Sequence, residues 1–121
     1  MRYDEISGTE ILDRQTGLIW QRAIAEIVTY EETHEYAERV VRETGRAWRV
    51  PTIDELASLV DRGRCRPASE FPGMTSTLFW SSSPYVGYTD FGWYVSFGNG
   101  EIGISNPADR FGSVRLVRDK S

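Results

Sequence analysis

The chain has 121 residues, which fits a single domain over residues 1–121, because two halves would each be too small to bury an adequate core. Its composition, 40% hydrophobic and 26% charged, is that of a globular protein. Fourteen basic against eighteen acidic residues give a net charge of −4, which disfavours nucleic acid as a partner because a grip on phosphate backbones needs a basic face.

The opening of the chain is predicted to form two strands. Residues 9–13 (T-E-I-L-D) and 18–23 (L-I-W-Q-R-A) have the pattern of strands. Residues 14–17 separate them as a turn, and Gly17 occupies a position where a positive φ is expected.

A first helix is predicted to start after Thr29. Glu32 follows Thr29 by three residues, which is the spacing of a capping box. Apolar residues then recur at helical spacing: Tyr30, Ala37, Val40 and Val41. Gly45 is placed to end the helix, and the charge-rich face over residues 31–46 is expected to face solvent.

A second helix is predicted to start after Thr52, with Glu55 completing another capping box and Pro51 keeping the entry extended. Its expected buried face is Ile53, Leu56, Leu59 and Val60. The helix is expected to end before Arg62.

The second half of the chain returns to strands after a loop at residues 62–77, which is rich in Gly and Pro. Strand character starts at Leu78, and residues 93–97 alternate between apolar and mixed positions. Gly-Asn-Gly at 98–100 predicts a hairpin turn, after which Ile102 and Ile104 resume the alternation. A polar loop at 105–112 precedes a last strand, residues 113–118.

This order of elements predicts an α+β fold, with two helices packed on a twisted, mostly antiparallel sheet and long loops on one side.

Five sequence blocks carry a resemblance to a known family. Residues 48–61 contain W-R-V-P-T-I-D-E-L and S-L-V-D, close to the W-R-L-P-T-x-x-E-L-x-S-L-V-D signature of the Lcl C-terminal domain family. The other blocks follow in the family's order: 13–21 (D-R-Q-T-G-L-I-W-Q), 79–83 (F-W-S-S-S), 93–100 (W-Y-V-S-F-G-N-G) and 114–118 (V-R-L-V-R). The chain therefore resembles this family, named for the C-terminal domain of a bacterial collagen-like adhesin, over nearly its whole length.

The resemblance implies a C-type-lectin-like fold, in the branch shared with formylglycine-generating enzymes and with the hypervariable proteins of diversity-generating retroelements. Family members are typically extracellular or envelope-associated. This chain departs from that pattern, because it shows no signal peptide or membrane anchor, no apolar run near the ~20 residues of a spanning helix, and one cysteine, Cys65. The cysteine usage favours a reducing compartment, so the chain is predicted to be cytoplasmic.

Catalytic residues are not predicted. His34 is the only histidine and falls inside the first helix, where a packed or half-exposed residue is expected. The serine run at 81–83 lacks a nucleophile elbow and is expected to hydrogen-bond loop backbone. Enzymes of the related branch use a cysteine pair with copper, and Cys65 has no second cysteine to pair with.

Neither a metal nor a cofactor is predicted. One Cys and one His give poor support for zinc. Asp90, Asn106 and Asp109 fall in loops that would suit calcium, but the Glu-Pro-Asn or Gln-Pro-Asp tripeptide and the Trp-Asn-Asp element of calcium-dependent sugar lectins are absent.

The remaining block residues are expected to be structural. The four tryptophans are assigned to the core: Trp20, Trp48, Trp80 and Trp93. Arg49 and Arg115 are expected to pair with carboxylates at the edge of the core, drawn from Asp13, Glu55 or Asp61.

The candidate binding surface consists of two loops, residues 84–92 and 105–112, because loops on a rigid scaffold carry function disproportionately. Tyrosine is favoured in recognition surfaces because it offers a large contact area at low entropic cost. The candidate contact residues are Tyr85, Tyr88, Asp90, Phe91, Asn106, Asp109 and Arg110.

Two classes of function compete. In the first, which the sequence favours, the domain binds a protein partner as an inhibitor or adaptor, for example one encoded by a mobile element. In the second it binds glycan, as the adhesin relatives do, and an anionic glycan would be repelled by the net charge unless Arg62, Arg64 and Arg66 cluster. An enzyme of the formylglycine-generating branch is a weaker third alternative.

Overall fold

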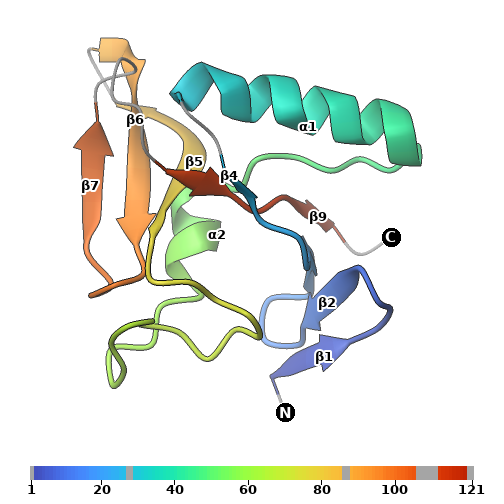
Figure 1. The fold of residues 1–121 in the computed structure, drawn as a ribbon, viewed down its shortest axis with the longest axis horizontal. Helices are drawn as coiled ribbons and strands as arrows, with labels where there is room; N and C mark the ends of the chain where they lie inside the picture. Colours follow the sequence, from blue (N-terminus) through green and yellow to red (C-terminus); the bar gives the residue numbers. More distant parts are fainter. Residues whose placement is uncertain (1, 27–28, 86–87, 106–111, 120–121) are drawn as a thin grey trace.

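The computed structural model describes residues 2–26, 29–85, 88–105 and 112–119, with all side chains except those of residues 30, 84, 85, 88–91 and 105. The described residues form two sheets and two helices (Figure 1). The first sheet has the order β1-β2-β3-β9, and each neighbouring pair is antiparallel. Its strands are β1 (Tyr3–Glu5), β2 (Glu10–Asp13), β3 (Leu18–Gln21) and β9 (Val117–Asp119).

The second sheet has the order β4-β8-β5-β6-β7. Its strands are β4 (Ala25–Glu26), β5 (Leu78–Tyr85), β6 (Tyr88–Ser96), β7 (Ile102–Ser105) and β8 (Ser113–Val114). All neighbouring pairs are antiparallel except β5 and β8, which run parallel where Phe79 meets Ser113. The prediction of an α+β fold with mostly antiparallel strands is therefore confirmed, although the strands divide between two sheets rather than one.

The division into two sheets depends on the segment predicted as one strand, residues 113–118. It is broken at Arg115 and Leu116, so that β8 joins the second sheet and β9 joins the first. Both residues at the break are fully buried. Their polar groups are bonded there: the Leu116 carbonyl accepts the Gln21 amide, and the Arg115 guanidinium donates to backbone carbonyls. The chain thus crosses between sheets inside the core, and the prediction of a single strand there is wrong.

Helix α1 (Tyr30–Thr44) starts and ends where the sequence predicted. The Thr29 hydroxyl accepts the Glu32 amide at 3.4 Å, and Gly45 takes the left-handed conformation (φ 70°) while its amide donates to the Val41 carbonyl. The buried face is Thr33, Ala37 and Val40. Val41 is 36% exposed, so its assignment to the buried face is wrong; it lies one position round the helix from Val40, at the rim.

Helix α2 (Ile53–Ala57) has the predicted capping box, in which the Thr52 side chain accepts the Glu55 amide and the Glu55 side chain accepts the Thr52 amide. The helix is shorter than predicted: it ends at Ala57, with Ser58 as its C-cap. Leu59 follows in a turn, yet it is only 1% exposed, so the buried position was predicted correctly although the helix does not reach it.

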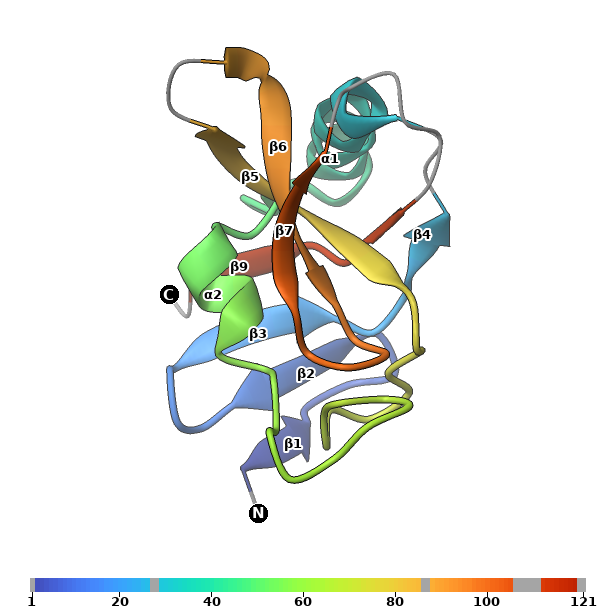
Figure 2. The same cartoon turned by 90° about the vertical axis from the view of Figure 1, so that its left-hand side faces the viewer.

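The core joins both sheets and both helices. Leu56 of α2 packs in one cluster with Trp20 of the first sheet and Phe79 of the second, so α2 lies between the two sheets (Figure 2). A second cluster places Val40 of α1 against Trp48. Trp20, Trp48 and Trp80 are buried, as predicted, whereas Trp93 is only half-buried. Neither helix in this described part of the chain is long and apolar enough to cross a membrane.

Candidate functional site

The segment predicted as the loop 84–92 and the start of the segment 105–112 meet at one end of the second sheet. Tyr85 at the end of β5 pairs with Tyr88 at the start of β6. Gly92 of β6 pairs with Ser105, the last residue of β7. The end of β5, the start of β6 and the end of β7 therefore lie at the same end of the sheet, close to the start of α1 (Figures 1 and 2).

Most of the segment predicted as the loop 84–92 is strand. Pro84 and Tyr85 belong to β5, and Tyr88, Asp90 and Phe91 belong to β6, with the strand pairing shifted in register around Pro84. Proline can lie in a strand at such an irregularity, where a ladder hydrogen bond is already lost. The Pro and Gly residues that suggested a turn thus mark a bulged hairpin. Asn106, Asp109 and Arg110 lie outside the described residues.

The serine run beside this hairpin is engaged by its neighbours. The Ser81 hydroxyl donates to the Trp93 carbonyl at 2.7 Å and accepts the Ser83 amide at 3.2 Å. The Ser83 hydroxyl accepts the amide of Ile53, the first residue of α2, at 3.0 Å. The prediction that these hydroxyls bond backbone is therefore confirmed for Ser81 and Ser83.

The first of the predicted core-edge ion pairs is Arg49 with Glu55. The guanidinium meets both carboxylate oxygens of Glu55 at 2.6 and 2.8 Å and also contacts Asp119 at 3.0 Å. Burial alone would raise the pKa of Glu55, but the bonds from Arg49 and from the Thr52 amide outweigh it and lower the pKa below its usual 4.5. The same bonds raise the pKa of Arg49. This pair ties the α2 cap to the end of β9.

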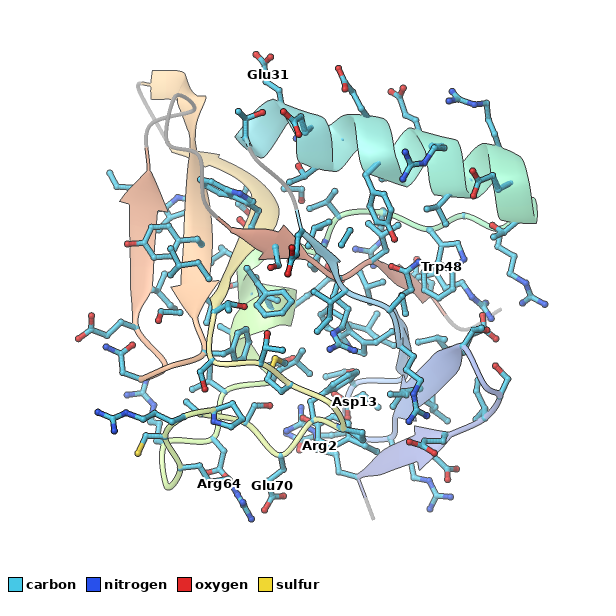
Figure 3. The ribbon with its side chains drawn as sticks, in the orientation of Figure 1. Arg2, Asp13, Glu31, Trp48, Arg64 and Glu70 are labelled. Carbon is cyan, nitrogen blue, oxygen red and sulfur yellow. The ribbon has the colours of Figure 1, made fainter. Side chains whose placement is uncertain are left out.

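Asp13 pairs with a residue that the sequence analysis did not consider. Its carboxylate is fully buried and accepts two bonds from Arg2, each at 2.9 Å, and one from the Gln15 amide (Figure 3). Arg2 also donates to the Ser58 carbonyl at 2.8 Å. Burial acts to raise the pKa of Asp13, but these bonds outweigh it and the pKa is lowered from 3.8.

Acid should therefore weaken this corner of the fold. Because the native pKa of Asp13 is depressed, its contribution is fully present above the unfolded value of 3.8 and is lost as the pH falls through the lower native value. We expect Asp13→Asn to lower the free energy of unfolding by about 1–3 kcal/mol near neutral pH, and by less as the pH approaches about 2–3, in urea titrations. Asp4→Asn is the control, because the Arg14–Asp4 pair is exposed. A deficit for Asp13→Asn that does not change with pH would contradict this account.

Arg115 does not form the predicted ion pair. Its guanidinium donates to the carbonyls of Gln21 and Arg22 at 3.1 and 2.9 Å, is 3.5 Å from the Gly73 carbonyl, and lies over the Phe71 ring. Burial lowers the pKa of Arg115 to about 10, which still leaves it charged at neutral pH. Among the described residues no carboxylate forms a salt bridge with it, so the prediction of a paired Arg115 is wrong.

Two grooves of about 580 Å³ each flank α1, and Trp48 lines both (Figure 3). In the first, the Glu10 carboxylate binds Arg118 at 2.8 Å, and the Arg118 guanidinium lies over the Trp48 ring at 5.3 Å. The second runs past His34 and Val41 on the other side of the helix. Neither groove could be predicted from the sequence, since their walls come from segments far apart in the chain.

The remaining candidates for chemistry are exposed. Cys65 and His34 both lie at the surface. Within the residues that the structure describes, no three His, Cys, Asp or Glu side chains are grouped so that they could hold a metal ion.

Arg64 forms salt bridges with Glu70 at 2.7 Å and Asp61 at 3.3 Å, so its charge is partly neutralised (Figure 3).

Comparison with known proteins gives one match. The sequence model of the Lcl C-terminal domain family covers residues 9–118, which is nearly the whole chain. Neither the curated proteins nor the solved structures include a match.

Proposed function

This chain belongs to the Lcl C-terminal domain family, and from that premise we propose that it is an adhesin-like, non-catalytic recognition domain that binds a protein partner. The proposed binding surface is the end of the second sheet at which β5, β6 and β7 meet, here called the hairpin end. We further propose that the fold is of the C-type-lectin-like class and that the domain acts in the cytoplasm as an inhibitor or adaptor.

The observation that carries the proposal is the strand pairing at the hairpin end. Because Tyr85 pairs with Tyr88 and Gly92 pairs with Ser105, two chain segments distant in sequence start from adjacent positions on one sheet. A rigid sheet that presents two neighbouring segments is the arrangement by which scaffolds carry recognition surfaces. Tyr85, Tyr88 and Phe91 give this end the aromatic composition that protein interfaces favour.

The charged residues support a non-catalytic role. Both carboxylates with a lowered pKa, Asp13 and Glu55, are held by arginines and by backbone amides at a turn or a helix cap. These carboxylates accept hydrogen bonds from arginines and amides that hold the fold together, so we assign them a structural role and not proton transfer. Ser81 and Ser83, which could otherwise act as nucleophiles, are bound to backbone.

The salt bridges of Arg64, in the loop that carries Arg62, Arg64 and Arg66, favour a protein partner over an anionic glycan. Arg64 lies between Arg62 and Arg66 and is bound to two carboxylates, Glu70 and Asp61. A polyanionic glycan would have to displace these partners or rely on the flanking arginines alone. The net charge of −4 adds a general repulsion.

The test is capture of a partner from the native host's lysate by the tagged chain, with mass spectrometry of the retained protein. We expect one protein in stoichiometric amount with the wild type and with the control Arg14→Ala, whose arginine lies in the turn after β2 and forms an exposed pair with Asp4. The double variant Tyr88→Ala and Arg110→Ala should retain at least about tenfold less, as for the loss of central interface contacts.

Equal capture by the double variant would remove the hairpin end as the binding surface. If no protein is retained, glycan arrays with and without calcium become the decisive measurement. A glycan that binds there would support the adhesin-type alternative, and genes of a phage or of an envelope operon beside this one would favour the inhibitor or the adhesin respectively.

A further inference from the structure

The outer edge of β7 has the hydrogen-bonding capacity of an unpaired strand. β7 is the last strand in the order of the second sheet, and among the described residues no strand pairs with its outer side (Figures 1 and 2). Such an edge presents amides and carbonyls that can template another strand. Natural edges are usually protected by charge, proline or a bulge, yet β7 reads Ile-Gly-Ile-Ser.

The strand register shows which groups face outward. The Ser96 amide donates to the Glu101 carbonyl at 2.8 Å, so Glu101 faces β6. Because backbone groups alternate in direction along a strand, Gly103 also faces β6, whereas the amides and carbonyls of Ile102 and Ile104 point away from it. These same two residues are 49% and 38% exposed, so unpaired backbone groups and apolar side chains coincide.

Gly103 lies at the centre of this edge, and the Tyr94 side chain packs against one face of it. A Cβ at position 103 would lie 2.6 Å from the Tyr94 hydroxyl oxygen. Tyr94 in turn packs edge-on against Trp80, with ring centroids 6.3 Å apart. The middle of β7 is thus held against β6 and β5 by this packing.

We infer that this edge pairs with β7 of a second copy of the chain, antiparallel and centred on Gly103. In that register Ile102 of one copy lies opposite Ile104 of the other, and every outward amide and carbonyl of these residues has a partner. Glu101 lies opposite position 105, which is uncharged, so no like charges meet across the strands. Centring the pair on Ile102 or Ile104 instead would leave the other isoleucine without its counterpart.

The self-complementary sequence commits the edge to a second copy rather than to an unrelated strand. A closed two-fold dimer uses the same surface on both partners, and the five residues 101–105 satisfy that condition for backbone bonding, apolar contact and charge. The pairing would continue the second sheet across both molecules. This inference goes beyond the proposed function, because it concerns the purified chain alone.

The test is sedimentation velocity of the purified chain over about 1–500 μM, a range that covers weak to moderate association. We expect a concentration-dependent dimer for the wild type. Ile104→Lys places an ammonium in the pairing register and should weaken association by at least about tenfold. Ile6→Lys is the matched control, since Ile6 is 47% exposed and lies outside β7, and it should dimerise like the wild type.

Amide hydrogen exchange supplies a second readout that loss of folding would not mimic. In the dimer the amides of Ile102 and Ile104 should be protected at high concentration and exchange faster on dilution, whereas the inward amide of Gly103 stays protected throughout. A wild type that is monomeric at every concentration would overturn the inference, as would Ile104→Lys dimerising normally. Loss of a lysate partner by Ile104→Lys, with a monomeric wild type, would assign the edge to another protein's strand and also overturn it.

Discussion

Replacing Arg115 with alanine should lower the free energy of unfolding by about 3 kcal/mol. The guanidinium is 1% exposed and donates to the carbonyls of Gln21 and Arg22. Its removal takes the guanidinium donor away from those carbonyls, at about 1–3 kcal/mol for each one that stays unsatisfied, and opens a cavity beside Phe71. The gain from no longer burying a charge offsets part of this loss. Urea denaturation at neutral pH measures the difference.

Two further variants separate the polar contacts of Arg115 from its packing and from the loss of an exposed arginine. Arg22→Ala removes an exposed arginine paired with Glu5 and should cost less than about 1 kcal/mol. Arg115→Met keeps much of the volume but donates no hydrogen bond, so it should recover only the packing part of the loss. If Arg115→Met were as stable as the wild type, the carbonyl bonds would not hold the crossing between the sheets.

Arg115 also shows where sequence reasoning fails. Residues 113–118 were predicted as one strand, and Arg115 was expected to pair with a carboxylate at the edge of the core. The actual partners are backbone carbonyls of Gln21 and Arg22, more than ninety positions away. A side chain that bonds backbone leaves no trace in the residue types of its partners, so neither the break nor the crossing could be predicted.

Local signals were read correctly because their physics is local. The capping box of Thr52 and Glu55 and the left-handed Gly45 depend on residues within one helical turn, and both occur as predicted. The Gly-Asn-Gly turn is also present, with Gly100 at φ 84°. The end of α2 was predicted too late, because Leu59 is buried by tertiary packing although it lies beyond the helix.

The candidate site was predictable only in part. Residues 84–92 and 105–112 were predicted as the candidate surface because they lie between family blocks, and the structure places the first segment and the start of the second at one end of a sheet. The turn signal at Pro84 concealed a strand, since Tyr88 and Phe91 lie in β6. The edge of β7 carried a sequence pattern, Ile-Gly-Ile, but its importance depends on β7 being last in the sheet, which only the strand order shows.

Trp80 and Tyr94 connect Gly112 with the β7 edge. Trp80 is 1% exposed and stacks edge-on with Tyr94, which covers Gly103 of β7. Trp80 also leaves no room beside Gly112, which precedes β8. A change at Gly112 is therefore transmitted to the ring on which β7 packs.

Replacing Gly112 with alanine should lower the free energy of unfolding by at least about 3 kcal/mol, from backbone strain and overpacking together. Its φ of 119° is rarely adopted by residues with a Cβ, and an added Cβ would lie 2.5 Å from Trp80 Nε1 and 2.9 Å from Cδ1. The indole is enclosed by the core and cannot move aside without cost. Urea denaturation followed by tryptophan fluorescence reports both the stability and the displacement of the ring.

Gly45→Ala is the matched control for this substitution. Gly45 also has a positive φ, 70°, but an added Cβ there meets nothing within 4 Å. Its replacement should therefore cost only the left-handed backbone penalty of about 1–2 kcal/mol, with native fluorescence unchanged. The excess for Gly112→Ala measures the collision with Trp80. Equal losses for the two variants would mean that Trp80 yields freely, and then the ring could not hold β7 in place against β6.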